Sequence, residues 1–315
     1  MKIPEYKSLQ EKNEAFGDNY QRISTITELK PFFENCKSFK DYIFRGICEA
    51  KYMNFTSAQR KYMVNDLVSS KIEVLIQKQI ESVNREHKHL LSKYYKSLGI
   101  APNDFLYLGI AQHYGGISPL LDFTTDLRTA LFFMADGAVF PQQGIDDIGN
   151  YSSLYLIPNS ELKNFNDTLK GIAERTSIEI DELVGEKKLT IAKTDNIIAL
   201  LADFDQFKDT NKDWYLLIPN NRETYSVPIK GINIRISGVF SISNLNIVAQ
   251  KGCFVFYLPQ QSLSPFETPL RCIDIHKSLL PYINEFTRLK KSDVYPDEYD
   301  MVMDSYNKVL RNILN

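Results

Sequence analysis

The chain has 315 residues, 43% of them apolar and 24% charged, which is enough to build a sizeable core and excludes an intrinsically disordered chain. Its 37 basic and 39 acidic residues leave a formal charge of −2, which disfavours a strongly basic nucleic-acid binder. The four cysteines form no Cys-x-x-Cys pair, so neither a disulfide framework nor a zinc ribbon is predicted. With no apolar run near the ~18–20 residues that span a bilayer, we expect a cytoplasmic protein without membrane association.

The N-terminal part of the chain begins with a polar stretch. Residues 1–24 are polar, and we expect them to be loosely ordered. Residues 27–33 are typical of a short helix after a threonine cap. Residues 41–46 have strand propensity, and Gly46 ends that strand because glycine permits a sharp turn.

Residues 57–98 carry the clearest helical periodicity of the chain. Gly99 and Pro102 end the pattern, and its length predicts a break near residues 84–88. Residues 51–100 hold nine Lys or Arg against four Asp or Glu, a balance of +5. This basic stretch is either a solvated helix face or a docking face for an anionic partner.

The remaining elements alternate between strands and helices. A helix is predicted over 127–135, with Thr125 or Asp126 as its cap, and an acidic helical insertion over about 160–205. Strands are predicted over 153–157, 214–218, 232–242 and 246–258, and a C-terminal helix over 291–315.

This order favours an α+β fold over a doubly wound α/β fold, since the strand-rich part lies late. We expect a small, mostly antiparallel sheet with flanking helices, a long helix in the N-terminal half and a helical insertion. The main domain is predicted to run from residue 25 to residue 290.

Two segments carry groups that suit ligand chemistry. Arg45 ends an apolar strand, where it is either a structural residue or a ligand for phosphate or carboxylate, whose geometry its planar guanidinium matches. In residues 112–133, the polar groups His113, Asp122 and Thr124 lie among apolar neighbours. That loop either caps a helix with a buried aspartate or presents these groups to a ligand.

The same segments resemble the FRG-domain family, which is named for the Phe-Arg-Gly found here at residues 44–46. The resemblance is carried by Phe44-Arg-Gly46, His113-Tyr-Gly115, Ser118-Pro-Leu-Leu-Asp-Phe-Thr124, Ala130-Leu-Phe-Phe133 and Asn246-Ile-Val-Ala-Gln-Lys-Gly-Cys-Phe254, with Arg60 as a further match. The chain departs from the family pattern at Ile47, Pro119 and Phe123, where Gln, Arg and Trp are usual. Similar domains occur in bacterial conflict and phage defence, so the resemblance implies a toxin-like or antiviral effector.

The order of these segments is also distantly similar to that of Arg-class ADP-ribosyltransferases, which use NAD as a co-substrate and need no metal. The resemblance implies that Arg45, beside Gly46, holds the NAD pyrophosphate and that Thr124 or Thr125 orients the nicotinamide ribose. Gln250 would stand where those enzymes carry a glutamate that holds the ribose 2′-hydroxyl and stabilises charge at the anomeric carbon.

A neutral amide stabilises that charge less well than a carboxylate does, so Asp122 or Glu223 is a candidate for the missing charge. We therefore predict one cleft surrounded by Arg45, His113, Asp122, Thr124 and Gln250, with His113 as a proton donor or hydrogen-bond partner and Asp122 positioning the loop or His113.

Two functions remain open from the sequence. The first is an NAD-dependent transferase or NAD glycohydrolase acting on a protein or nucleic-acid target. The second is a non-catalytic sensor module that binds a nucleotide or a macromolecular partner. A metal-dependent hydrolase is not favoured, because no carboxylates lie at metal-ligand spacing.

Overall fold

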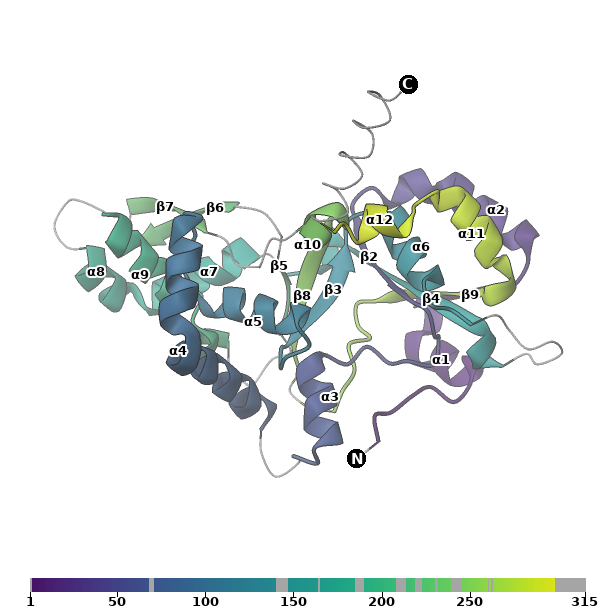
Figure 1. The fold of residues 1–315 in the computed structure, drawn as a ribbon, viewed down its shortest axis with the longest axis horizontal. Helices are drawn as coiled ribbons and strands as arrows, with labels where there is room; N and C mark the ends of the chain where they lie inside the picture. The colour runs from purple at the N-terminus through teal and green to yellow at the C-terminus, as the bar shows by residue number, and fades with distance from the viewer. Residues whose placement is uncertain are drawn as a thin grey trace, which may run out of the picture.

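The computed structural model describes residues 2–67, 71–139, 147–163, 165–184, 190–207, 214–218, 223–229, 232–238, 245–259, 261 and 263–297. It confirms the α+β prediction: helices surround a seven-stranded sheet of order β1-β9-β4-β2-β3-β8-β5, in which only β1 and β9 pair in parallel (Figure 1). Its strands are β1 (Tyr20–Ile23), β2 (Tyr42–Ile47), β3 (Leu120–Thr124), β4 (Tyr151–Pro158), β5 (Trp214–Ile218), β8 (Gly252–Leu258) and β9 (Arg271–His276). Strands β6 (Glu223–Ile229) and β7 (Ile232–Gly238) form a separate hairpin.

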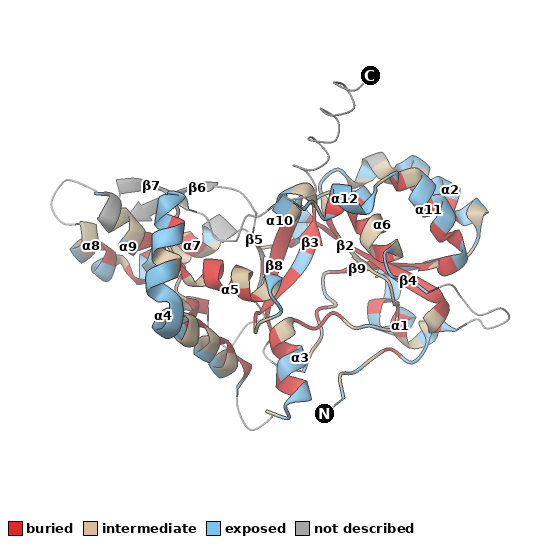
Figure 2. Ribbon diagram, viewed as in Figure 1, coloured by how far each residue is buried: buried red, intermediate tan, exposed pale blue. Residues whose placement is uncertain are grey.

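The helices cover the sheet in three groups, and buried residues concentrate where helices meet strands (Figure 2). Helices α2 (Ile26–Glu34), α6 (Leu127–Ala135) and α11 (Leu280–Thr287) cover one face of β2, β4 and β9. Helix α1 (Leu9–Phe16) covers the other face. Helices α3 (Ser57–Val64), α4 (Ile72–Ser97), α5 (Asp104–His113), α7 (Phe165–Arg175), α8 (Ser177–Val184) and α9 (Ile191–Leu201) pack on the side of β5 and β8. Two short helices, α10 (Leu245–Ala249) and α12 (Lys291–Val294), complete the set.

The sheet is weakest at its centre. Strands β2 and β3 share the single register pair Phe44–Thr124, whereas β2 pairs with β4 over six residues. Two strands joined at one pair diverge beyond it, because no ladder of hydrogen bonds holds them together. Beyond Phe44 no register pair joins these strands, and the Arg45 guanidinium of β2 donates instead to the backbone carbonyl of Asp122 on β3.

The N-terminus differs from the loose order expected of residues 1–24. Ser8 caps α1, and β1 adds to the sheet edge through the register pairs Tyr20–Cys272 to Ile23–Ile275. Lys12 has no exposed surface. Its ammonium pairs with the carboxylate of Asp274 at 2.8 Å, which compensates for the loss of hydration on burial. The polar composition of this segment therefore conceals a buried ion pair that ties it to the last strand of the sheet.

The long helical stretch breaks at a different place from the one predicted. The break lies between α3 and α4, where Asn65 ends α3 and Asp66 has a positive φ of 53°. Helix α4 then continues unbroken through residues 84–88, because residues 72–97 contain neither glycine nor proline.

Two segments in the C-terminal part of the chain differ in extent from the predicted elements. The strand predicted over 246–258 begins only at Gly252, and the residues before it form α10 and a turn. Of the predicted C-terminal helix, residues 298–315 lie outside the described part of the chain, and residues 291–294 form the short helix α12.

Candidate ligand-binding site

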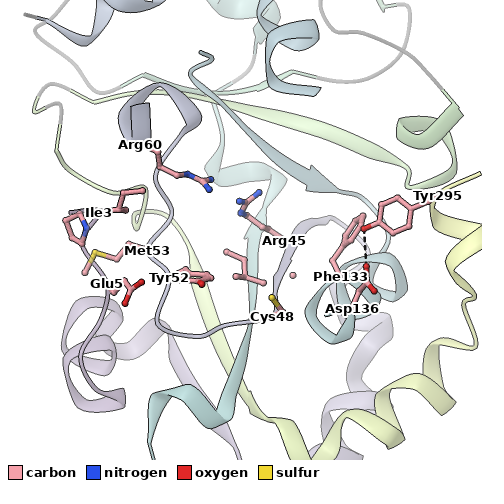
Figure 3. Close-up of a pocket in the computed structure, with 13 residues that line it drawn as sticks. Ile3, Glu5, Arg45, Cys48, Tyr52, Met53, Arg60, Phe133, Asp136 and Tyr295 are labelled. Atoms are coloured by element: carbon pink, nitrogen blue, oxygen red, sulfur yellow. Dashed lines mark hydrogen bonds between the residues drawn. The ribbon is translucent and has the colours of Figure 1, made fainter. Parts of the chain in front are cut away.

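A cavity of about 620 Å³ opens at the end of β2, beside the gap between β2 and β3 (Figure 3). Its walls come from the N-terminal segment, the end of β2, the loop after β2, helices α3 and α6, and the segment after α12. The lining residues are Ile3, Pro4, Glu5, Arg45, Gly46, Ile47, Cys48, Tyr52, Met53, Arg60, Phe133, Asp136 and Tyr295. Of the residues predicted for the site, Arg45 and Gly46 line this cavity.

The alternation of β2 places Arg45 in the cavity. Phe44 is buried in the core beneath α6, and Gly46 lies on the same face, against α6. Arg45 therefore points to the opposite face, where its Nη1 donates to the backbone carbonyl of Asp122 at 2.7 Å. Its Nε is buried and has no acceptor among the residues that the structure describes.

Arg60 brings a second guanidinium to the same cavity. It extends from α3, and its Nε donates to the carbonyl of Phe55 at 3.0 Å. Burial lowers the pKa of Arg45, Asp122 opposes that shift, and Arg60 adds to it by like-charge repulsion. Burial also lowers the pKa of Arg60, again opposed by Asp122. Two partly desolvated cations that face one carboxylate favour the binding of a further anion.

Asp122 lies beside Arg45 and does not line the cavity. Its side chain is 61% exposed, and one carboxylate oxygen is 3.9 Å from Nη1 of Arg45. The same oxygen accepts a hydrogen bond of 2.8 Å from Nε2 of Gln112, near the end of α5. His113 follows Gln112 and is exposed, with its ring edge-on to Tyr114. The structure therefore brings Arg45 and Asp122 together and places His113 outside the cavity lining.

The two threonines and Gln250 form a neighbouring cluster that does not line the cavity. The Thr124 hydroxyl donates to the carbonyl of Gln250 at 2.6 Å and accepts from the amide of Asp126 at 3.0 Å. Thr125 lies near the carbonyl of Lys251, at 3.4 Å. These hydroxyls connect the start of α6 to the turn before β8. Their observed contacts are structural.

Gln250 contacts the segment that carries Tyr295, one of the residues that line the cavity. Its side-chain amide donates to the carbonyl of Val294 at 3.0 Å, in the residue before Tyr295. Tyr295 closes one wall of the cavity, packs against Phe132 and Phe133, and directs its hydroxyl towards Asp136 at 3.4 Å. Burial and the carboxylate of Asp136 raise the pKa of Tyr295 to about 12, so this hydroxyl stays protonated at neutral pH.

Sequence reasoning missed most of this wall. Tyr295 precedes Pro296, and its surroundings resemble the start of a helix rather than part of a site. Glu5 belongs to a stretch that was expected to be loosely ordered, and Phe133 and Asp136 end a helix whose pattern indicates core packing. Arg60 and Phe133 are the exceptions, since the motifs that carry the family resemblance include both.

The described residues form neither a metal-binding cluster nor a membrane-spanning helix. No group of three or more His, Cys, Asp or Glu side chains there converges on a point that could hold a metal ion. Within the same residues, no helix combines the length and the apolar composition needed to cross a bilayer. The four cysteines are not disulfide-bonded.

Comparison with known proteins agrees with the motifs. The family model described as the FRG domain matches residues 40–140, about a third of the chain, which includes β2, β3 and the helices α3 to α6. No curated protein and no solved structure matches the chain. The matched segment contains Arg45, Gly46, Arg60 and Asp122, and the chain therefore carries an FRG domain.

Proposed function

We propose that the cavity binds a nucleotide through its phosphates, with NAD as the ligand that the sequence motifs favour. The observation that carries this proposal is the pair of guanidinium groups, from Arg45 and Arg60, that line one cavity, together with the buried Nε of Arg45, which lacks an acceptor among the described residues. Guanidinium groups bind phosphate oxygens through charge-assisted and bidentate hydrogen bonds. A phosphate between the two arginines would offset the like-charge repulsion between their guanidinium groups.

The rest of the cavity suits the remainder of a nucleotide. Its volume of about 620 Å³ falls within the range of roughly 300–1,000 Å³ typical of small-molecule sites. Tyr52, Phe133 and Tyr295 offer aromatic surface, and Glu5 and Asp136 offer carboxylates that accept from hydroxyl or amino groups. The cavity thus combines cationic, aromatic and anionic parts, as a nucleotide requires.

Replacing Arg45 or Arg60 with glutamine should weaken binding of ADP and of NAD by roughly 10- to 100-fold, because a hydrogen bond to a charged group contributes about 1.5–3 kcal/mol. Titration calorimetry measures the affinities. Thermal unfolding provides a second readout, since a ligand at 100 times its dissociation constant adds about 2.7 kcal/mol of stability.

Arg85→Gln is the matched control, because this arginine is 74% exposed on α4 and does not line the cavity. It should leave both affinities unchanged. Failure of the wild-type protein to bind ADP, NAD and pyrophosphate would contradict the proposal.

A second candidate function is ADP-ribosyl transfer from NAD to a protein or nucleic acid, as an effector in bacterial conflict or phage defence. The biological setting follows from the family resemblance. The observation that favours the chemistry is the exposed carboxylate of Asp122, which lies outside the cavity lining but 3.9 Å from Nη1 of Arg45, a lining residue. In this reaction the bond between the anomeric carbon and nicotinamide breaks, and nicotinamide leaves with the electron pair. A nucleophile on the target, or water, forms the new bond and gives up its proton, while a carboxylate stabilises the positive charge that develops on the ribose.

Nicotinamide release from NAD distinguishes the transferase from a sensor. If Asp122 stabilises the developing charge, Asp122→Asn should slow release by about 100-fold or more while changing the affinity for NAD little. Chromatography of the products gives the rate. Binding of NAD without any release by the wild-type protein would instead support the non-catalytic sensor, a role with which the engaged hydroxyl of Thr124 and the engaged amide of Gln250 are compatible.

A further inference from the structure

The cavity has two chemically different ends. In Figure 3, Arg60 lies on one side and Phe133, Asp136 and Tyr295 lie on the other, with Arg45 between them. The first end presents guanidinium groups and suits phosphate, since Glu5, the carboxylate on that side, pairs with Lys51 at 3.6 Å. The second presents two aromatic rings and a carboxylate, which repels phosphate and suits a planar group that donates a hydrogen bond.

The second end is held in place from several directions. Gln250 fixes the backbone of Val294, which is 1% exposed, and Tyr295 follows directly. Nε of Arg128 donates to the carbonyl of Thr287 at 2.8 Å, where α11 ends and the segment turns back towards the cavity. The ring of Tyr295 then packs against Phe132 and Phe133, with ring centroids 6.2 and 6.0 Å away. These contacts fix the wall before any ligand binds, which lowers the ordering cost of binding.

We propose that Phe133, Asp136 and Tyr295 form a base-binding subsite that selects a planar heterocycle bearing an N–H donor, such as the amino group of adenine or the carboxamide of nicotinamide. This inference rests on the proposed nucleotide function and specifies how the ligand is oriented: phosphates at Arg45 and Arg60, ring at Tyr295.

Asp136 accounts for the selectivity. An ionised carboxylate only accepts hydrogen bonds, so it binds an N–H group and disfavours a carbonyl oxygen at the same place. The contact from the Tyr295 hydroxyl, at 3.4 Å, is long for an O–H···O bond and uses only one of the acceptor positions of the carboxylate. Asp136 therefore retains capacity for a ligand donor.

The test compares pyrophosphate, ADP and the diphosphate of purine riboside, which has the adenine ring system without the amino group. Wild-type protein should bind ADP at least tenfold more tightly than either of the other two. Tyr295→Ala should weaken ADP by roughly 5- to 100-fold through lost stacking and leave pyrophosphate unchanged. Asp136→Asn should bring ADP and the purine analogue to within about twofold of each other.

Tyr295→Phe is the matched control, since it keeps the ring and removes only the hydroxyl, and it should bind ADP within about threefold of wild type. Unfolding midpoints of all variants show whether the wall still folds. The subsite is overturned if pyrophosphate and ADP weaken together in Tyr295→Ala, or if Asp136→Asn keeps the preference for ADP over the analogue. These outcomes differ from failure of the proposed function, in which the wild-type protein binds none of the three compounds.

Discussion

Replacing Asp274 with alanine is expected to lower the free energy of unfolding by about 3–5 kcal/mol, because it leaves the buried ammonium of Lys12 without its counter-charge. Neither side chain has exposed surface, and their charged atoms are 2.8 Å apart. Chemical denaturation followed by circular dichroism measures the change.

The surrounding network explains why the effect is large. Asp274 also accepts from Ser153 at 2.7 Å and from Tyr20 at 3.0 Å, and Lys12 donates in addition to the carbonyl of Ala50 at 2.9 Å. These contacts join α1, β1, β4 and β9. Losing the carboxylate therefore loosens the N-terminal segment and the edge of the sheet together.

The network also sets how this stability depends on pH. Burial lowers the pKa of Lys12, but Tyr155, Cys272 and Asp274 raise it, and the net result is a pKa above the ordinary value. A raised pKa means that the contribution is fully present at neutral pH and is lost only as pH rises through the folded-state pKa, in strongly alkaline solution.

A surface ion pair from the same strand gives the matched control. Arg271 pairs with Glu161 at 3.0 Å, and the two side chains are 41% and 39% exposed. Glu161→Ala should cost less than about 1 kcal/mol, because water screens and solvates an exposed pair. Equal losses in the two variants would contradict the account of a buried pair.

Local patterns predicted much of the scaffold. The α+β class and the helix over 127–135 are confirmed, and of the two predicted caps Asp126 is the one observed. The strand predicted over 41–46 is found at 42–47, so it continues past Gly46, which was expected to end it. Each depends on neighbours in the sequence, such as the amide of Thr129 that donates to the Asp126 side chain at 3.2 Å. Such elements can be predicted from the sequence because the residues that interact lie within one or two helical turns of each other.

Contacts between residues far apart in the sequence could not be predicted in the same way. Lys12 lies in a polar stretch, and the partner that orders it is 262 residues away. Gln250 is linked to the Tyr295 wall of the cavity by a side-chain amide that donates to the backbone carbonyl of Val294, 44 residues later. Neither contact leaves a periodic pattern in the sequence, so only the fold reveals them.

Gly46→Ala is expected to lower the free energy of unfolding by about 3 kcal/mol, at the upper end of the range for overpacked sites. A Cβ at this position would lie 1.8 Å from the carbonyl oxygen of Ala130 and 2.7 Å from the amide nitrogen of Met134. Both atoms belong to the backbone of α6, so no side chain can move aside to relieve the clash. Strand β2 and helix α6 would have to separate, and Arg45 would shift with the strand.

The ligand-free protein distinguishes packing from ligand binding at Gly46. A glycine needed only for close approach to a phosphate would weaken nucleotide binding on substitution without changing the denaturation midpoint in the absence of ligand. A glycine needed for strand–helix packing lowers that midpoint. Gly171→Ala is the control, since nothing lies within 4 Å of its added Cβ and α7 gains a better helix former, so the free energy of unfolding should rise by about 0.5–1 kcal/mol. We expect the denaturation midpoint of Gly46→Ala to fall, because Gly46, the third residue of the Phe-Arg-Gly motif, lets α6 pack closely on β2. This packing holds β2 in the position from which Arg45 reaches the cavity.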